Sequence, residues 1–363
     1  MIIINFECDR YYLICICLIT DYNVIKTTEG GFMFRKTWKQ IKILIILLLI
    51  IFFFPRSFLP RPAYSHQADS FETYTRQNES ELRLAEYKDD ENTLRLKLSQ
   101  LELINKSRRK HRAPPLKLDI LASRVANKIC KEAAANGFTG HWNLAGETPY
   151  MRYAFAGGYD HVMENAYGEW SSDKYSSTGS DISSMMEDGH QSFMSERPPN
   201  DGHKKNIINK SHNYVGIGYY LSDNQFRYYE EFIDRYFTFT NIPEEAITGE
   251  PVKITLQTDG TMYPYFLIVY YEKLPKSMTP AMITGRGSYN DFTRDTYKTL
   301  SPWELTGYKK GLSYTIPLTF NKEGLYYIQT YIDKKEYSGP VSFSTEGKTP
   351  YTGIVIKVTK GKK

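Results

Sequence analysis

Histidine is the residue type in this chain whose placement most suggests chemistry. Of the seven histidines, six lie between residues 111 and 212, and the last 150 residues contain none. A neutral imidazole is the commonest metal ligand in proteins, and its ordinary pKa lies near neutral pH. The clustering is therefore a hint of metal or acid–base chemistry in one domain. The six residues are His111, His141, His161, His190, His203 and His212.

Two of these histidines follow a glycine in a short motif. Gly140-His141 comes directly after a predicted helix, and Gly202-His203 reads as a tight turn into a short helix. Two imidazoles can bind one Zn²⁺ at about 2.0–2.1 Å and leave positions open for water. A nearby carboxylate could then act as a base on that water, or orient a histidine through its second nitrogen. Alternatively, each histidine could simply satisfy backbone groups at the end of a helix.

Other hydrolase signatures are missing from the sequence. Neither Gly-x-Ser-x-Gly nor His-Glu-x-x-His occurs. Cys130 falls on the apolar stripe of a predicted helix, so we expect it to be a small buried residue rather than a nucleophile. His161 lies three residues before Glu164 and could be its neighbour, whereas His190 and His212 are not expected to be ligands.

The elements that must position these residues can be predicted from periodicity. Leucine and isoleucine at helical spacing predict a helix over 94–104, and a second stripe begins at the N-cap candidate Asp119 and ends at Asn136-Gly137. A third helix is expected around 182–193, before Pro198-Pro199. Two strands are expected at 214–221 and 225–234. Helices followed by strands indicate an α/β fold, of the α/β/α or α+β sandwich kind.

Short motifs in this region resemble those of a known family. They are Leu101 to Asn105, Pro115-Leu116, Leu118-Asp119, Gly140-His141, Glu164-Asn165, Gly202 to Ile207 and Val215 to Gly218. In this order and spacing they resemble bacterial CAP domains, the superfamily of cysteine-rich secretory proteins, antigen 5 and pathogenesis-related 1. The resemblance implies an α-β-α sandwich, and we place the domain at residues 94–238.

The resemblance also implies a cleft formed by two histidines and two glutamates. Carried onto this sequence, these are His141, Glu164, His203 and, as the second glutamate, Glu196, with Glu187 as the alternative. His141 and His203 would be the metal ligands, and Zn²⁺ is the expected metal. The family implies binding of lipids, sterols, small molecules or cell-surface partners at least as often as catalysis. A metal-dependent hydrolase of peptides or lipids is the alternative, and a structural adhesion module is a second one.

The composition changes near Asn241, and a second domain is expected over 239–363. Short runs rich in β-branched and aromatic residues alternate with turn residues, which predicts an antiparallel β-sandwich. We find no catalytic constellation in this part. Its expected role is adhesive or structural.

The beginning of the chain predicts export. Residues 33–65 contain twelve consecutive apolar residues, Ile43 to Phe54, after four basic ones, which is typical of a signal peptide or a membrane anchor. Both remain open, and either places the protein outside the cytoplasm. Residues 1–32 could be an upstream extension that is not translated, if synthesis starts at Met33. Residues 66–93 are polar and are predicted to be a spacer.

The overall charge argues against one class of partner. The net charge of +5 over 363 residues is dilute, and no regular basic stripe with aromatic residues is present. We therefore expect no nucleic acid as partner.

Overall fold

The computed structural model describes residues 25–26, 32–33, 70–289, 295–339 and 344–361. The chain divides into two units, 1–66 and 67–363. In the first unit, β1 (Ile25–Lys26) and β2 (Phe32–Met33) form an antiparallel pair. Apart from these four residues, the predicted extension and signal or anchor lie outside the described residues. Within the described part, no helix combines the length and the apolar character that crossing a membrane requires.

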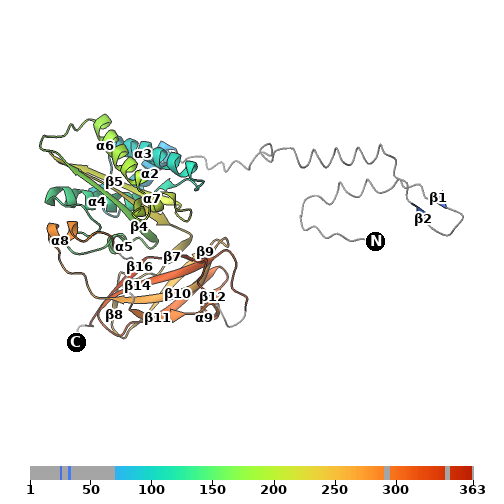
Figure 1. Cartoon of the computed structure of the whole chain (residues 1–363). Helices are drawn as coiled ribbons and strands as arrows, with labels where there is room; N and C mark the ends of the chain where they lie inside the picture. Colours follow the sequence, from blue (N-terminus) through green and yellow to red (C-terminus); the bar gives the residue numbers. More distant parts are fainter. Residues whose placement is uncertain (1–24, 27–31, 34–69, 290–294, 340–343, 362–363) are drawn as a thin grey trace. The chain divides into compact units, whose positions relative to one another are not determined.

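The second unit begins with a three-layer α/β/α arrangement (Figure 1). Its central sheet has the strand order β3-β5-β6-β4, in which β3 and β5 are parallel and the other pairs antiparallel. The strands are β3 (Lys117–Leu118), β4 (His161–Trp170), β5 (Tyr214–Leu221) and β6 (Gln225–Asp234). The two strands predicted from alternation are confirmed, whereas β4 was not predicted from the sequence.

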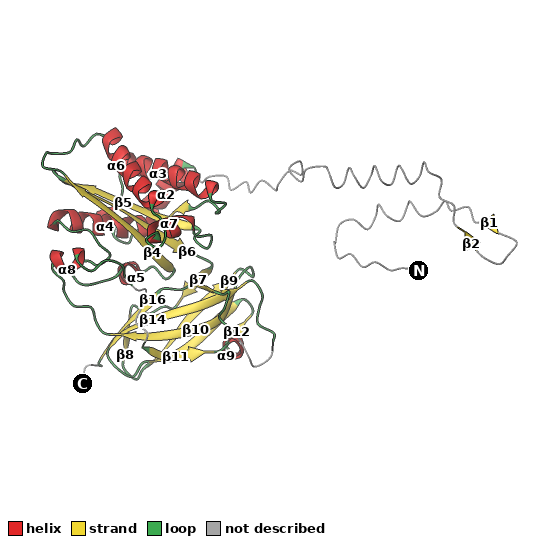
Figure 2. Cartoon of the chain, in the orientation of Figure 1, coloured by secondary structure: helices red, strands yellow, loops and turns green. Residues whose placement is uncertain are grey.

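Helices cover both faces of this sheet (Figure 2). One face packs on α3 (Glu91–Lys110), α6 (Gly179–Ser195) and α7 (Gly202–Ile208), and the other on α4 (Ile120–Asn136) and α5 (Pro149–Phe155). Asp119 caps α4 by accepting a hydrogen bond from Ala122 N at 2.7 Å, and Gly137 ends it with a φ of 68°. The predicted fold class is confirmed. Cys130 is fully buried, as predicted.

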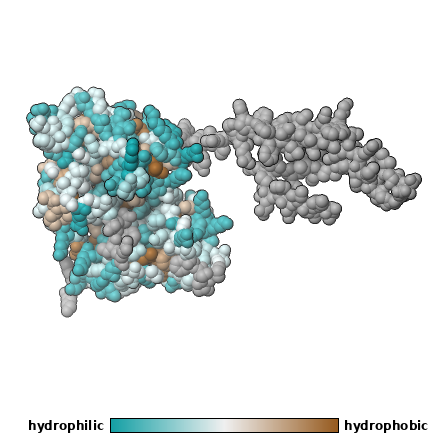
Figure 3. Space-filling view, viewed as in Figure 1, coloured by the Kyte–Doolittle hydropathy of each residue, from teal (hydrophilic) through white to brown (hydrophobic). Residues whose placement is uncertain are grey.

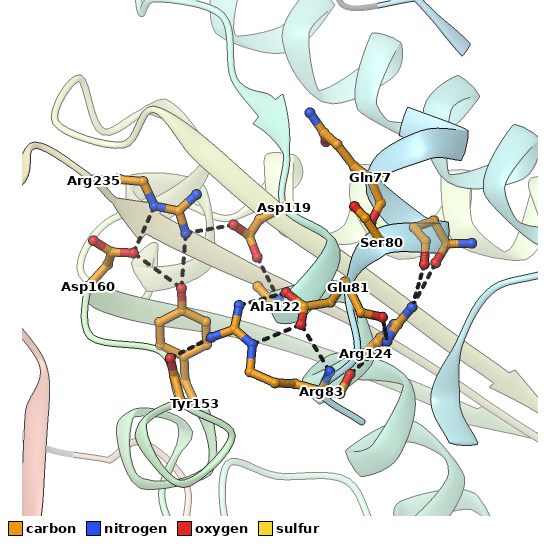
Figure 4. Close-up of polar contacts among 12 residues, drawn as sticks. Gln77, Ser80, Glu81, Arg83, Asp119, Ala122, Arg124, Tyr153, Asp160 and Arg235 are labelled. Carbon is orange, nitrogen blue, oxygen red and sulfur yellow. Dashed lines mark hydrogen bonds and ion pairs between the residues drawn. The ribbon is translucent and has the colours of Figure 1, made fainter. Parts of the chain in front are cut away.

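The predicted spacer is wrong for the residues that the structure describes. Instead, α2 (Phe71–Ser80) and the 3₁₀ turn η3 (Ala85–Tyr87) pack on the first domain. Arg124 of α4 donates hydrogen bonds to the carbonyls of Asn78, Glu81 and Arg83 (Figure 4). Two polar residues of the segment, Asn78 and Asp89, are buried and hydrogen-bonded rather than solvated.

The remaining strands form two sheets packed on a shared apolar core. One has the order β11-β10-β14-β16-β8, with β15 paired to β14, and the other has the order β12-β13-β9-β7. All strand pairs in both sheets are antiparallel except β16 with β8 in the first sheet, which is parallel. The strands are β7 (Phe237–Thr240), β8 (Glu245–Ile247), β9 (Pro251–Thr258), β10 (Tyr263–Glu272), β11 (Thr296–Leu300), β12 (Lys309–Lys310), β13 (Ser313–Thr319), β14 (Gly324–Asp333), β15 (Thr349–Pro350) and β16 (Ile354–Thr359). Two short helices, α8 (Pro280–Thr284) and α9 (Pro302–Gly307), lie between them in sequence.

The β-rich part packs directly on the α/β/α part. Tyr150 of α5 donates a hydrogen bond to Glu272, and its ring meets Tyr327 edge-on at 5.0 Å between centroids. Tyr351 accepts hydrogen bonds from the backbone N of Tyr236 and Phe237, at 2.6 and 3.1 Å. An apolar cluster that contains Val125 and Met151 of the α/β/α part and Leu325 and Val355 of the β-rich part also joins the two.

Candidate functional site

The four residues predicted for the cleft come from four different places in the chain. His141 follows α4 in a loop, Glu164 lies on β4, Glu196 directly follows α6, and His203 lies in the first turn of α7. The structure brings the two imidazoles together, with ring centroids 6.3 Å apart and planes inclined by 36°. It also places one glutamate on each histidine. The predicted grouping is therefore present as a spatial cluster.

One half of the cluster is buried. His141 Nδ1 lies 2.8 Å from Glu164 Oε1, and the side chains are 12% and 0% exposed. Arg152 of α5 forms an ion pair with the other carboxylate oxygen of Glu164 and donates to the carbonyl of His141 at 2.7 Å. Arg152 therefore fixes both members of this histidine–glutamate pair.

Burial sets the charge state of this half. Burial, and to a lesser extent the neighbouring Arg152 cation, lowers the pKa of His141 to about 4. Burial raises the pKa of Glu164 to about 7, against the opposing effect of Arg152. At neutral pH His141 is therefore a neutral imidazole, which is the form that binds metals.

The other half of the cluster is more open. His203 Nδ1 lies 2.5 Å from Glu196 Oε1, with side chains 33% and 23% exposed. Glu196 Oε2 also accepts hydrogen bonds from the backbone N of His203 at 3.0 Å and of Lys204 at 3.3 Å. The carboxylate thus satisfies the first amides of α7 as well as orienting the imidazole. Glu187, the alternative, is exposed on α6.

In this part of the chain the sequence model of the cysteine-rich secretory protein family, CAP, matches residues 101–239. These residues are a CAP domain. The resemblance seen in the sequence is therefore confirmed. No curated protein matches the chain.

Three solved structures were similar to parts of the chain. An extracellular protein with an SCP domain from Bacillus anthracis has 20% identity and a TM-score of 0.30, and covers 38% of this chain and 40% of its own. An outer surface protein from Borrelia burgdorferi has 17% identity and a TM-score of 0.31, covering 39% and 93%. A cysteine-rich secretory protein from Staphylococcus aureus has 17% identity and a TM-score of 0.24, covering 38% of each chain. The chain thus spans under half of two of these proteins, and the assignment of the CAP domain rests on the family match.

Sequence reasoning missed the two buried charged residues that lie beside Glu164. Arg152 is 7% exposed, and Glu231 of β6 is fully buried. Glu231 is the partner of Glu164 in the pairing of β4 with β6, and its Oε1 lies 3.5 Å from Arg152 Nη2. Burial and the neighbouring Glu164 raise the pKa of Glu231 well above its ordinary value. Glu231 lies on β6, which was predicted from the sequence, and faces Glu164 on β4, which was not. A prediction of β4 and its register would therefore have revealed the pair.

A buried hydrogen-bond network around Asn165 holds the backbone of His203. Asn165 donates to the carbonyl of His203 at 3.1 Å and to Glu230 at 2.9 Å, and it accepts from Asn206 at 3.0 Å. Glu230 is fully buried and also lies 3.4 Å from His190. His190 is therefore a core residue of the CAP domain. His161 and His212 are likewise buried, at 5% and 1% exposure.

The histidine pair fits a metal only as a two-ligand site. Both Nδ1 atoms face glutamates, so Nε2 is the atom of each ring that remains for coordination. Two imidazoles that share one Zn²⁺ have centroids about 5–6 Å apart, so the observed 6.3 Å requires a small movement of one ring. Among the described residues, no group of three or more potential side-chain ligands is arranged to hold a metal ion. Water or a bound ligand would have to complete the coordination.

Proposed function

We propose that this is an exported CAP protein whose cleft binds a ligand through a divalent metal held by His141 and His203. The single observation that carries the proposal is the pair of imidazoles, each oriented by a carboxylate on Nδ1. A carboxylate on the second nitrogen fixes the tautomer and the ring direction of a metal-binding histidine. When bound, Zn²⁺ would supply a Lewis acid that holds an oxygen or nitrogen atom of the ligand.

Binding is favoured over hydrolysis because both carboxylates are already engaged. Glu164 is held by His141 and Arg152, and Glu196 is held by His203 and two backbone amides. A general base on water needs a carboxylate with access to that water. These glutamates instead orient the imidazoles. The hydrolase interpretation therefore has no specific observation in its favour.

The exposed surface favours a small or surface-presented ligand over a lipid or sterol. The face of the molecule drawn in Figure 3 is mostly hydrophilic, with hydrophobic residues in small separate patches. We propose that the C-terminal domain helps present this cleft outside the cell, where the apolar run Ile43 to Phe54 would direct the protein.

Isothermal titration of the full-length protein with ZnCl₂ tests the metal site. We expect about one site per chain in the wild type, and its loss in the double variant His141→Ala/His203→Ala. The control is His111→Ala, because His111 is an exposed histidine outside the cleft. Binding that survives in the double variant, or its absence in the wild type, would refute the proposal.

A further inference from the structure

The C-terminal domain sends one segment back onto the CAP domain, beside the cleft. This segment, residues 273–289, connects β10 with the part of the chain before β11 and contains α8. In Figure 1, α8 lies next to α4 and α5, away from the strands of its own domain. Met278 N donates to the carbonyl of Leu144 at 2.8 Å, which places the segment along the loop that carries His141.

The contact between the segment and the CAP domain is close. Ile283 of α8 is fully buried, and a Cβ added at Gly140 would lie 2.9 Å from its side chain. A Cβ at Gly146, which has a φ of 79°, would lie 2.1 Å from the carbonyl oxygen of Lys276. Arg286 lies over the ring of Trp142, 4.4 Å from its centroid. The loop 140–146 is therefore shaped to receive this segment.

Tyr289 brings the segment into the site itself. Its ring centroid lies 4.8 Å from that of His141, at an interplanar angle of 51°. Its hydroxyl oxygen accepts a hydrogen bond from the backbone N of Glu164 at 3.0 Å. One side chain from outside the CAP domain thus touches both members of the buried histidine–glutamate pair.

We propose that Tyr289 is a positioning residue of the cleft, which holds the ring of His141 and the β4 backbone at Glu164 so that His141 faces His203. This inference rests on the proposed metal site. Trp142 contacts Tyr289, and both lie on the His141 side of the cleft. The side chain of His141 is 12% exposed, whereas that of His203 is 33% exposed. A ligand therefore approaches from the His203 and Glu196 side, and the C-terminal domain determines the shape of the CAP cleft.

The test compares Tyr289→Ala with Tyr289→Phe in the full-length protein. Loss of a group that orients a metal-binding histidine typically weakens metal affinity by about 10–100-fold. We expect such a loss of Zn²⁺ affinity in Tyr289→Ala, together with a changed visible spectrum of the Co²⁺ complex. Tyr289→Phe keeps the ring on His141 but lacks the hydroxyl that accepts from Glu164 N, so it should restore most of the affinity and the spectrum. Met282→Ala is the control, because Met282 is 54% exposed on the same segment.

Two results would overturn the inference separately from the proposed function. If the wild type binds Zn²⁺ and Tyr289→Ala binds it equally well with an unchanged Co²⁺ spectrum, the metal site stands and the positioning role is refuted. If the wild type binds no Zn²⁺, the proposed function fails, and long-range ¹H–¹⁵N spectra of the imidazoles decide the inference. We then expect one tautomer of His141 in the wild type and Tyr289→Phe, and a mixture in Tyr289→Ala. The same single tautomer in all three would refute it.

Discussion

Arg152 lies between two buried carboxylates that face each other across neighbouring strands. Glu164 and Glu231 are paired in the register of β4 and β6, and both are at most 2% exposed. One guanidinium cannot neutralise two carboxylates fully, so we expect one of the two carboxyl groups to keep its proton. Because the pKa of Glu231 is raised well above its ordinary value, we assign the retained proton to Glu231 and the ion pair with Arg152 to Glu164.

The stability of Glu231→Gln relative to wild type should increase as the pH rises. Unfolded Glu231 loses its proton near pH 4.5, whereas the folded protein keeps it to higher pH. Above pH 4.5 native wild type therefore binds more protons than its unfolded state, and its free energy of unfolding falls as the pH rises. Glu231→Gln removes this loss. We expect its advantage over wild type to grow by up to about 1.4 kcal/mol for each pH unit over which wild-type Glu231 stays protonated.

Urea unfolding of Glu231→Gln and wild type at a series of pH values measures this difference. Glu187→Gln is the matched control, because Glu187 is an exposed carboxylate of the same domain. Its difference from wild type should stay flat with pH. An equally flat difference for Glu231→Gln would contradict the assignment of the proton.

Removing the buried Arg152 cation should lower the free energy of unfolding far more than removing an exposed cation. Arg152→Met leaves Glu164 and Glu231 buried without their positive partner. Breaking a buried ion pair from one side typically costs about 3–5 kcal/mol. Lys205→Met is the control, because Lys205 is 66% exposed in its pair with Asp201 and should lose under about 1 kcal/mol. Equal losses in chemical denaturation would show that Arg152 is dispensable to the fold.

The close approach of α4 to the sheet depends on two glycines of β5. It packs on β5 where Gly216 and Gly218 face it, and a Cβ at either position would lie 2.4 Å or less from atoms of Ala122 or Ala126. The loop with His141 follows α4 directly. The distance between helix and sheet therefore sets where His141 enters the cleft.

Alanine at position 218 should push α4 away from the sheet. The new Cβ would lie 2.3 Å from the carbonyl carbon of Ala126, and overpacking of this kind typically costs about 1–3 kcal/mol or more. Gly202→Ala is the control, because nothing lies within 4 Å of its added Cβ, and its effect should stay within about 0.5 kcal/mol. Thermal unfolding compares the two. Similar melting temperatures for both variants would mean that the helix is free to move.

The segment before α3 is a second element whose role the sequence concealed. Lys97 of α3 is fully buried, and its Nζ lies 2.7 and 2.8 Å from the two carboxylate oxygens of Asp89. The composition of 66–93 predicts solvation, because composition does not reveal which polar residues find buried partners. The same is true of β4, where Glu164 and Asn165 interrupt the apolar pattern. Strands β5 and β6 were predictable because apolar side chains recur at every second position, such as Val215 and Ile217 in β5 and Phe226 and Tyr228 in β6.

Neutralising Asp89 should therefore lower the free energy of unfolding more than neutralising an exposed residue of the same segment. Asp89→Asn leaves Lys97 charged and buried, at a typical cost of about 3–5 kcal/mol. Glu86→Gln is the control, because Glu86 is exposed in the same segment. Chemical denaturation distinguishes the two interpretations. Wild-type stability in Asp89→Asn would show that the pair of Asp89 with Lys97 does not stabilise the fold.

At the scale of the whole molecule, the cleft is assembled from both domains. His141, Glu164, Glu196 and His203 could be found from sequence because short motifs surround them. Tyr289 could not, because its partner Glu164 lies 125 residues earlier and no motif marks either position as a contact. The fold classes of both domains were predictable from periodicity, whereas the packing of residues 273–289 on the CAP domain follows from tertiary structure alone.

The most direct test of the account is a crystal structure of the full-length protein soaked in ZnCl₂, with data collected at the zinc absorption edge. The account predicts one anomalous peak per chain within about 2.0–2.1 Å of Nε2 of both His141 and His203. It also predicts that Nδ1 of His141 stays on Glu164 and Nδ1 of His203 stays on Glu196. A map without a peak between the two imidazoles, or with zinc bound only elsewhere, would contradict it.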